Sequence, residues 1–262
     1  MRDSGLRAGD RLYRVADGER IVQAVLRDGE LIELDGDVFE RPRLVAPIPG
    51  GLASVRVLAP VQPTKIVAVG LNYRDHAAEQ GKPLPSEPLI FLKPSTAVIG
   101  PGDAIRLPPG AGRVDHEAEA GIVIRRRTYR IGAAHADDAV LGVICVNDVT
   151  ARDIQKRENK YTRAKGFDTF APIGPCVAIG LDTSDLAVEG WVNGQRRQAS
   201  TTRQLIFPVP DLVAFISHVM TLLPGDIIST GTPAGIGPLT AGDAVMVRVA
   251  GVGDLVNPVT DL

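Results

Sequence analysis

Hydrophobic and polar residues alternate through the first part of the chain. Between residues 11 and 45 the short stretches RLYRV, IVQAVLR and LIEL are separated by turn-forming DGE and DGD sequences. A period of two between turn residues predicts strands, so this part is expected to be a small β-rich unit. Residues 46–65 are rich in Pro and Gly and mark a boundary. We therefore expect a small N-terminal domain over residues 1–60 and a main domain over residues 61–262.

Longer apolar runs follow in the main domain. Strands are predicted for residues 66–70, DIIST and AVMVRVA, and buried strands for AGIVI and AVLGVICV. Three segments have the pattern of helices: 71–82, with Asn72 at its start and Gly81 at its end as caps; 150–160, with Thr150 and Asp153 as a capping pair; and 211–223. The fold class is therefore α+β, dominated by β-structure.

The amino-acid composition argues against several classes of function. The 262 residues are 44% hydrophobic and 23% charged, with a formal net charge of −2. This balance gives no electrostatic basis for binding nucleic acid or an acidic membrane surface. No apolar run approaches the roughly 20 residues of a membrane span, and the first residues lack the apolar core of a signal peptide, so we expect a cytoplasmic protein. The two cysteines lie in apolar stretches and are expected to be buried, reduced thiols.

The stretch VDHEAEAGIVI, residues 114–124, combines acidic and apolar positions. As a strand it places Asp115, Glu117 and Glu119 on one face with no Lys or Arg among them. Same-face carboxylates about 7 Å apart can converge on one cation, although a solvated acidic face is the simpler interpretation. Asp148, after a buried strand, is a candidate third ligand or a cap for the following helix. An all-carboxylate site favours Mg²⁺, Mn²⁺ or Ca²⁺ over Zn²⁺.

Other polar residues have two interpretations each. His76 and Glu79 share a face of the predicted 71–82 helix, where the carboxylate could orient the imidazole to activate a water, or form a surface ion pair. Thr232, in TGTPAGIGP, could hold a carboxylate or belong to a tight turn. Lys93 and Lys165 could each meet a substrate carboxylate or point to solvent.

Taken together, several stretches resemble the fumarylacetoacetate hydrolase family, specifically its short bacterial branch. They stand in the family's order and cover about residues 65–250: VGLNYRDHAAE, LIFLKPSTAV, VDHEAEAGIVI, VNDVTARDIQ, AKGFDTFAPIGP and LLPGDIISTGTPAGIGP. One departure is informative. Fumarylacetoacetase itself has an additional Asp ligand upstream of its helix histidine, and this chain has Val69 seven residues before His76.

The resemblance implies a site and a fold. The metal carboxylates fall on Glu117, Glu119 and Asp148. Asp115 shares the strand face of the two glutamates, and from that position we expect it to support the ligands without binding the metal. The remaining family positions fall on His76 and Glu79 for water activation, Lys165 for the chemistry, and Arg152, Gln155 and Thr232 for substrate binding. The implied fold is the family's mixed β-roll with a small N-terminal domain. The implied assembly is a homodimer, with Mg²⁺, or else Mn²⁺ or Ca²⁺, as cofactor.

The family's reactions share a 2-oxo-acid substrate that can chelate a metal. We expect hydrolytic C–C cleavage of an acylpyruvate- or fumarylpyruvate-type β-diketo acid with release of pyruvate, because the His76 and Glu79 pair is present. The alternative is a decarboxylase or an isomerase of oxaloacetate or 2-hydroxyhepta-2,4-diene-1,7-dioate in aromatic-acid catabolism. A remote alternative is a non-catalytic binding protein that keeps the metal as a structural clip.

Overall fold

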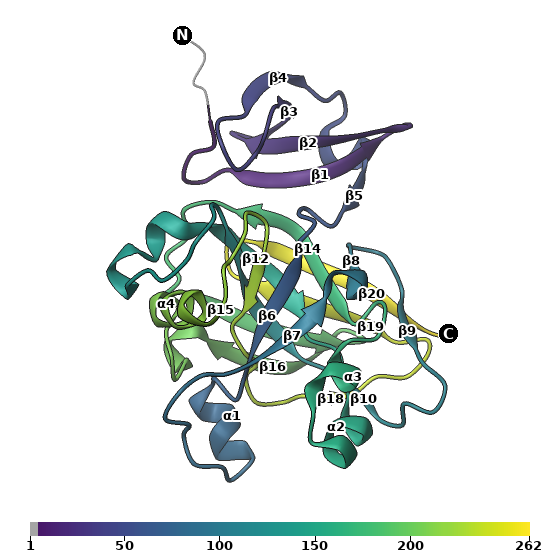
Figure 1. Ribbon diagram of the computed structural model, residues 1–262. Helices are drawn as coiled ribbons and strands as arrows, with labels where there is room; N and C mark the ends of the chain where they lie inside the picture. Colours follow the sequence, from purple (N-terminus) through teal and green to yellow (C-terminus); the bar gives the residue numbers. More distant parts are fainter. Residues whose placement is uncertain (1–4) are drawn as a thin grey trace.

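The computed structural model describes residues 5–262, and strands dominate it (Figure 1). One sheet has twelve strands, in which β4-β3-β2-β1-β14-β12-β11-β17-β6-β7 form the main path, β5 pairs with β1, and β8 pairs with β14. Its strands are β1 (Arg11–Asp17), β2 (Arg20–Arg27), β3 (Glu30–Asp35), β4 (Arg43–Pro47), β5 (Arg56–Leu58), β6 (Lys65–Gly70), β7 (Leu89–Pro94), β8 (Val98–Ile99), β11 (Ala118–Ile124), β12 (Val140–Asn147), β14 (Ala171–Ala178) and β17 (Ile227–Ser229).

Two smaller sheets and four α-helices complete the described fold. The three-stranded sheet has the order β13 (Thr150–Ala151), β10 (Val114–His116), β18 (Gly237–Pro238). The five-stranded sheet has the order β16 (Gln195–Thr201), β15 (Ala187–Val192), β19 (Ala244–Val249), β20 (Gly253–Asp261), β9 (Ile105–Leu107). The α-helices are α1 (Arg74–Glu79), α2 (Arg152–Glu158), α3 (Tyr161–Lys165) and α4 (Val209–Val219), and the short 3₁₀ turns are Gly51–Ser54, Ser95–Ala97, Ala133–His135, Asp137–Ala139 and Thr202–Gln204.

The all-apolar strands are buried on both faces, as their sequences predict. Alternate residues of β12 enter two separate cores: Val143 and Cys145 pack in one, and Ile144 and Val146 in the other. The first core also contains side chains of the five-stranded sheet and of α4, whereas the second contains side chains of β6, β14 and β17. A sheet held from both sides in this way provides a rigid support for residues at its strand ends.

The N-terminal strands β1 to β5 form the upper part of the molecule in Figure 1. They follow the alternation of the sequence, and β1 joins the main sheet through the pairs Arg11↔Ala178 and Leu12↔Val177. Leu12 and Tyr13 therefore belong to cores that are shared with the rest of the chain. The division after residue 60 stays a prediction. No helix among residues 5–262 is long and apolar enough to cross a membrane.

Two of the predicted helix starts are wrong. Asn72 does not cap α1, which begins after Tyr73, because the Asn72 amide instead bonds to the backbone of Phe207 and Thr230. Thr150 and Asp153 form no capping pair. Thr150 is part of β13, and its hydroxyl donates to the Asp148 carbonyl, while Asp153 accepts the Arg113 N–H. Helix α4 also begins and ends earlier than predicted, at Val209 and Val219.

The predicted strand over residues 114–124 is interrupted at Glu117. Strand β10 ends at His116 and belongs to one sheet, whereas β11 starts at Ala118 and belongs to another. The Glu117 backbone N–H bonds to the Asn147 side chain, and the Glu117 carbonyl accepts the Asp148 N–H. The chain thus turns from one sheet into the next at the residue expected to bind a metal. The period-of-two argument therefore does not hold across residues 115–119.

Candidate metal and active site

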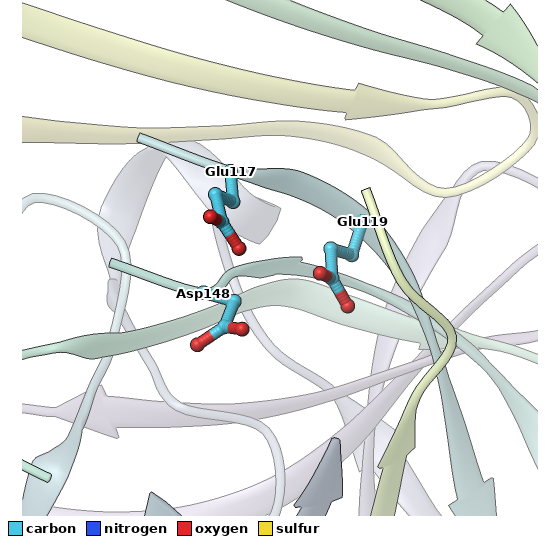
Figure 2. A group of neighbouring side chains, drawn as sticks. All are labelled: Glu117, Glu119 and Asp148. Atoms are coloured by element: carbon cyan, nitrogen blue, oxygen red, sulfur yellow. The ribbon is translucent and has the colours of Figure 1, made fainter. Parts of the chain in front are cut away.

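Three carboxylates converge where β11 begins and β12 ends. One ligand oxygen from each of Glu117, Glu119 and Asp148 lies within 4.8 Å of the others, and all three residues are buried. Figure 2 shows their side chains pointing into a common space. Antiparallel pairing of β11 with β12 places Ala118 opposite Asn147, which brings Asp148 beside Glu117. Asp148 is therefore not the cap of α2, which begins after Ala151.

The donor set fits a hard divalent cation. It consists of carboxylate oxygens only, as suits Mg²⁺, Mn²⁺ or Ca²⁺. Three buried carboxylates at such short range would repel one another strongly without cations nearby. Glu117, Glu119 and Asp148 are the residues that would hold the metal, while Asp115 lies outside the group and bonds to Arg113 and Arg152.

Protein cations surround the three carboxylates. The Lys165 ammonium donates to Glu117 Oε2 at 2.8 Å and to Asp148 Oδ2 at 2.5 Å. The Lys93 ammonium donates to Asp148 Oδ1 at 2.6 Å and to the Val149 carbonyl at 3.2 Å. Arg152 bonds to Glu117 and also, through Nε, to Asp115. Lys93 is fully buried, so the prediction that it might point to solvent is wrong.

The two glutamates of the group differ in proton affinity. Burial and the neighbouring Asp148 and Glu117 charges raise the pKa of Glu119 to about 8, which Ser229 only partly offsets by donating a hydrogen bond. Burial acts in the same direction on Glu117, but the charges of Lys165 and Arg152 outweigh it and hold the pKa of Glu117 well below its usual range. A proton therefore resides on Glu119 at neutral pH unless another cation replaces it.

The pKa values of Lys93 and Lys165 are shifted in opposite directions. Burial lowers the pKa of Lys93, although Asp148 opposes this effect. Burial acts the same way on Lys165, but Asp148 and Glu117 together raise its pKa above the usual value. Lys165 is consequently a fixed positive charge beside the carboxylates, which suits it to stabilise negative charge on a substrate.

The His76 and Glu79 pair forms on α1 as the spacing predicts. His76 Nδ1 lies 2.8 Å from Glu79 Oε2, and the Gln80 amide nitrogen lies 2.7 Å from His76 Nε2. Both contacts are satisfied when Nδ1 carries the proton and donates to Glu79, which leaves the Nε2 lone pair to accept from Gln80. His76 is 6% exposed, so this is not a pair between two solvated side chains. A water that replaces the Gln80 amide would meet a basic nitrogen.

A cavity of about 390 Å³ joins these groups. His76 lines it together with the three carboxylates, and so do the other residues predicted for the substrate, Arg152, Gln155, Lys165 and Thr232. The Arg152 guanidinium donates to the Gln155 side-chain oxygen at 2.6 Å, so these two residues form a unit. All the predicted site residues except Glu79 thus line one cavity, although up to 156 positions of sequence separate them. Glu79 contacts the cavity residue His76.

Thr232 is more constrained than the sequence suggested. Its hydroxyl donates to the Ala118 carbonyl at 3.0 Å and accepts from the Gln198 amide at 2.7 Å. The hydroxyl proton is therefore engaged within the protein, and a substrate carboxylate would have to displace the Ala118 carbonyl to receive it. Its predicted role in binding substrate stays untested.

Sequence reasoning missed several lining residues. Gln80 lies four positions after His76, which is the helical spacing that could have revealed it. The cavity wall further includes Lys82, Leu89, Phe91, Lys156, Asn159 and Tyr161. Nothing in their local pattern distinguishes them from ordinary surface or core residues, because they come from separate segments: the turn after α1, strand β7, helix α2 with the residue that follows it, and helix α3.

Comparison with known proteins identifies the arrangement. The family described as fumarylacetoacetate (FAA) hydrolase, C-terminal, matches residues 65–260. Protein Rv2993c of Mycobacterium tuberculosis is 45% identical over 259 residues, 95% of this chain and 97% of that one.

Two solved structures are similar over nearly their whole length. The 2-hydroxyhepta-2,4-diene-1,7-dioate isomerase of Mycobacterium marinum is 42% identical with a TM-score of 0.89, and the alignment covers 96% of this chain and 98% of that one. The maleylpyruvate hydrolase of Sphingobium sp. SYK-6, solved with manganese(II) and pyruvate, is 30% identical with a TM-score of 0.79, covering 96% and 99%. By its sequence, its mixed β-fold and its buried acidic group, this chain belongs to the fumarylacetoacetate hydrolase family.

Proposed function

We propose that the protein is a divalent-metal-dependent hydrolase that cleaves a C–C bond in an acylpyruvate- or fumarylpyruvate-type β-diketo acid and releases pyruvate. The observation that carries this proposal is the placement of the His76 base in the same cavity as Glu117, Glu119 and Asp148. A base beside a metal site is what water addition to a carbonyl requires, whereas decarboxylation needs no water at carbon.

The substrate's 2-oxo-carboxylate end would bind among the positive groups. Arg152 and Gln155 act as one hydrogen-bonding unit at the cavity wall, and Lys165 provides a buried ammonium beside them. A divalent cation held by Glu117, Glu119 and Asp148 would supply Lewis-acid stabilisation of the negative charge that develops on the pyruvate part. The tail of the substrate would then extend toward α1 and the 80–91 segment.

His76 and Glu79 would carry out the proton transfers. His76 Nε2 takes a proton from a water that has displaced Gln80, and Glu79 stabilises the resulting imidazolium through Nδ1–H. The water oxygen adds to the distal carbonyl carbon. The bond from that carbon to the methylene group then breaks, giving a carboxylic acid and the enolate of pyruvate. The enolate carbon takes up a proton, and the acid loses one at neutral pH.

A second candidate is an isomerase or decarboxylase of a 2-oxo- or 2-hydroxy-diene dicarboxylic acid, such as oxaloacetate or 2-hydroxyhepta-2,4-diene-1,7-dioate. The specific observation in its favour is the 42% identity with the M. marinum isomerase. The same carboxylates and cations would serve that chemistry, but His76 would then move a proton between carbon atoms or have no role.

The remaining properties belong to the same proposal. We infer a small 2-oxo acid as ligand, Mg²⁺ or Mn²⁺ as the working metal, a homodimer as the assembly, and the cytoplasm as the location. Mn²⁺ has support from the Sphingobium neighbour, which contains it. Light scattering coupled to size-exclusion chromatography would give the molar mass, and a value near that of one 27.8 kDa chain would contradict the dimer.

Product analysis tests the reaction itself. Purified protein would be offered acetylpyruvate, fumarylpyruvate and oxaloacetate in parallel, each with Mg²⁺, with Mn²⁺ and with excess EDTA. We expect metal-dependent release of pyruvate and one free acid from the diketo acids. Pyruvate and CO₂ from oxaloacetate alone would establish the decarboxylase instead. A metal-loaded protein that converts none of the three would contradict both the hydrolase and the decarboxylase, and would favour the isomerase or the binding protein.

A further inference from the structure

Strand β16 lies beside the site and contributes none of the residues assigned to it. Its residue Gln198 is fully buried, and both the oxygen and the nitrogen of its side-chain amide make hydrogen bonds. The oxygen accepts from the Ala118 N–H at 2.9 Å and contacts His116 Nδ1 at 3.1 Å. The nitrogen donates to the Thr232 hydroxyl at 2.7 Å and to the Pro233 carbonyl at 2.8 Å. One amide therefore connects the metal-site strand to the 230–238 loop.

These contacts close a ring at the backbone of Ala118, the residue between two of the carboxylates expected to bind the metal. Ala118 lies between Glu117 and Glu119. Its N–H donates to the Gln198 side-chain oxygen, and its carbonyl accepts from the Thr232 hydroxyl. Gln198 and Thr232 also bond to each other. The side chains of Gln198 and Thr232 thus make hydrogen bonds to the Ala118 backbone, whereas further along β11 the neighbouring strand β17 makes such bonds. The ring fixes the backbone from which both glutamates project.

A second residue of β16 reaches the dyad. Ser200 lies two positions after Gln198, on the same face of the strand. Its hydroxyl donates to Asp75 Oδ2 at 2.5 Å, and Asp75 Oδ1 accepts the His76 N–H at 2.7 Å. The start of α1 is therefore tied to β16 immediately before the catalytic histidine.

The loop supplies another connection between the same parts. Gly235 has φ of +96°, and a Cβ on it would lie 2.1 Å from the Arg197 carbonyl oxygen, so the loop rests directly on the backbone of β16. The Gly235 N–H donates to Glu79 Oε1 at 3.0 Å. Through these contacts β16 is connected to the start of α1, to the loop that bonds to Glu79, and to the backbone between Glu117 and Glu119.

We propose that Gln198 and Ser200 are positioning residues, which set the spacing between the metal ligands and the His76–Glu79 dyad from one strand. Neither residue lines the cavity that contains the carboxylates and His76. Gln198 acts on the metal ligands, and Ser200 acts on the dyad helix. The catalytic part of this inference rests on the proposed hydrolase function, whereas its part on metal affinity stands without it.

Two substitutions separate the two effects. Gln198→Met keeps the length of the side chain and removes its hydrogen bonds, so we expect the dissociation constant for Mn²⁺ to rise roughly 10- to 100-fold, as for other residues that orient metal ligands. Ser200→Ala should leave that constant within about twofold and lower kcat about tenfold with KM unchanged. Gln195→Met is the matched control, since Gln195 is an exposed amide on the same strand and should change neither value.

The measurements are calorimetric titration of chelator-treated protein with Mn²⁺, steady-state release of pyruvate, and hydrogen–deuterium exchange of the peptide over residues 71–82. Exchange in that peptide should accelerate in Ser200→Ala and stay unchanged in Gln195→Met. If Gln198→Met does not fold, Gln198→Asn replaces it, because the shorter amide cannot reach Ala118 and Thr232 together.

Two results would overturn the proposal: a folded Gln198 variant with wild-type Mn²⁺ affinity, or Ser200→Ala with wild-type exchange and wild-type kcat. Failure of the hydrolase proposal has a different signature. In that case the wild-type protein binds Mn²⁺ but releases no pyruvate from the diketo acids, and the affinity and exchange comparisons still decide the roles of Gln198 and Ser200.

Discussion

Glu117 and Glu119 lie two residues apart and are both buried, yet their environments act on them in opposite ways. Glu117 contacts Lys165 and Arg152, whereas the only donors to Glu119 among residues 5–262 are the Ser229 hydroxyl and the Gly231 N–H. Two neutral donors compensate a buried charge less than two cations do. Glu119 is therefore the carboxylate at which a proton and a bound metal ion would compete.

This competition makes metal binding depend on pH. Because the pKa of Glu119 is raised to about 8, loading the site below pH 8 must expel its proton. We expect Mn²⁺ affinity to increase from pH 6 to pH 8 and to level off above, with close to one proton released per ion at pH 6.5. Calorimetry in two buffers of different ionisation enthalpy measures that number. Glu119→Gln should abolish the release, and release of no proton by the wild type would contradict the assignment.

The same group affects stability in the absence of metal. In the unfolded chain Glu119 titrates near 4.5, and in the fold near 8, so the fold retains a proton that the unfolded chain loses between these values. Its contribution is fully present below pH 4.5 and is lost as the pH rises through 8. Chelator-treated protein should therefore become less stable across this window, an effect that added Mn²⁺ reverses.

His76 provides the test that separates the proposed reactions. His76→Ala removes the base and should lower the rate of diketo-acid hydrolysis by 10²- to 10⁴-fold, the usual range for general-base catalysis. Decarboxylation of oxaloacetate, which needs no activated water, should fall much less. Both rates are read from pyruvate release under saturating Mg²⁺. An equal loss in the two assays would mean that His76 does not act specifically on water.

At the scale of elements, Asn72 shows how separate segments are held around the site. Its side chain donates to the carbonyls of Phe207 and Thr230, at 3.1 and 2.8 Å, and accepts the Phe207 N–H at 2.9 Å. It thereby joins the entry to α1 to the start of the 230–238 loop and to the segment before α4.

Replacing Asn72 should be costly. Asn72→Leu leaves three backbone groups without a partner, two of them carbonyls, and we expect a loss of about 3 kcal/mol in the free energy of unfolding. Urea denaturation followed by circular dichroism measures it. Gln204→Leu, at an exposed amide, is the control and should stay within about 0.5 kcal/mol of the wild type. A similarly small change for Asn72→Leu would show that water satisfies the freed groups.

The elements that the sequence predicts well are those with a local cause. The apolar runs of β11 and β12 require burial on both faces, and the His76–Glu79 spacing follows from helical geometry alone. The interruption at Glu117 has no local cause, because it depends on Asn147, Asp148 and Gln198 from other strands. Lys93 was ambiguous for the same reason: only the position of Asp148 shows why an ammonium can be buried there.

At the scale of the whole molecule, the N-terminal strands share their cores with the main sheet. Leu12 packs with Ile66 and Ile144, which come from the main sheet beyond residue 60. We therefore expect one cooperative unfolding transition for the whole chain.

Leu12→Ala tests this expectation at a distance from the site. A cavity at this fully buried position should destabilise the protein by roughly 2–5 kcal/mol. We expect one thermal midpoint, lowered by the same amount in circular dichroism and in tryptophan fluorescence. The fluorescence reports on a distant part of the fold, because Trp191 lies in β15 of the five-stranded sheet. Ile21→Ala, at a side chain 57% exposed, should have little effect. If only the N-terminal strands unfolded early, the two signals would separate.

The cations around the carboxylates affect how the protein would take up a metal ion and exchange it for another. Asp115, Glu117 and Asp148 are in direct contact with Arg113, Arg152, Lys93 and Lys165, whereas Glu119 contacts no cation among residues 5–262. Three of the four carboxylates are thus already paired within the polypeptide, and the fourth is neutralised by its own proton below pH 8. We therefore expect the chain to reach the native state at neutral pH without an ion and to exchange one ion for another without refolding. The identity of the bound metal would then depend on its concentration in the surroundings and on its affinity for carboxylate ligands.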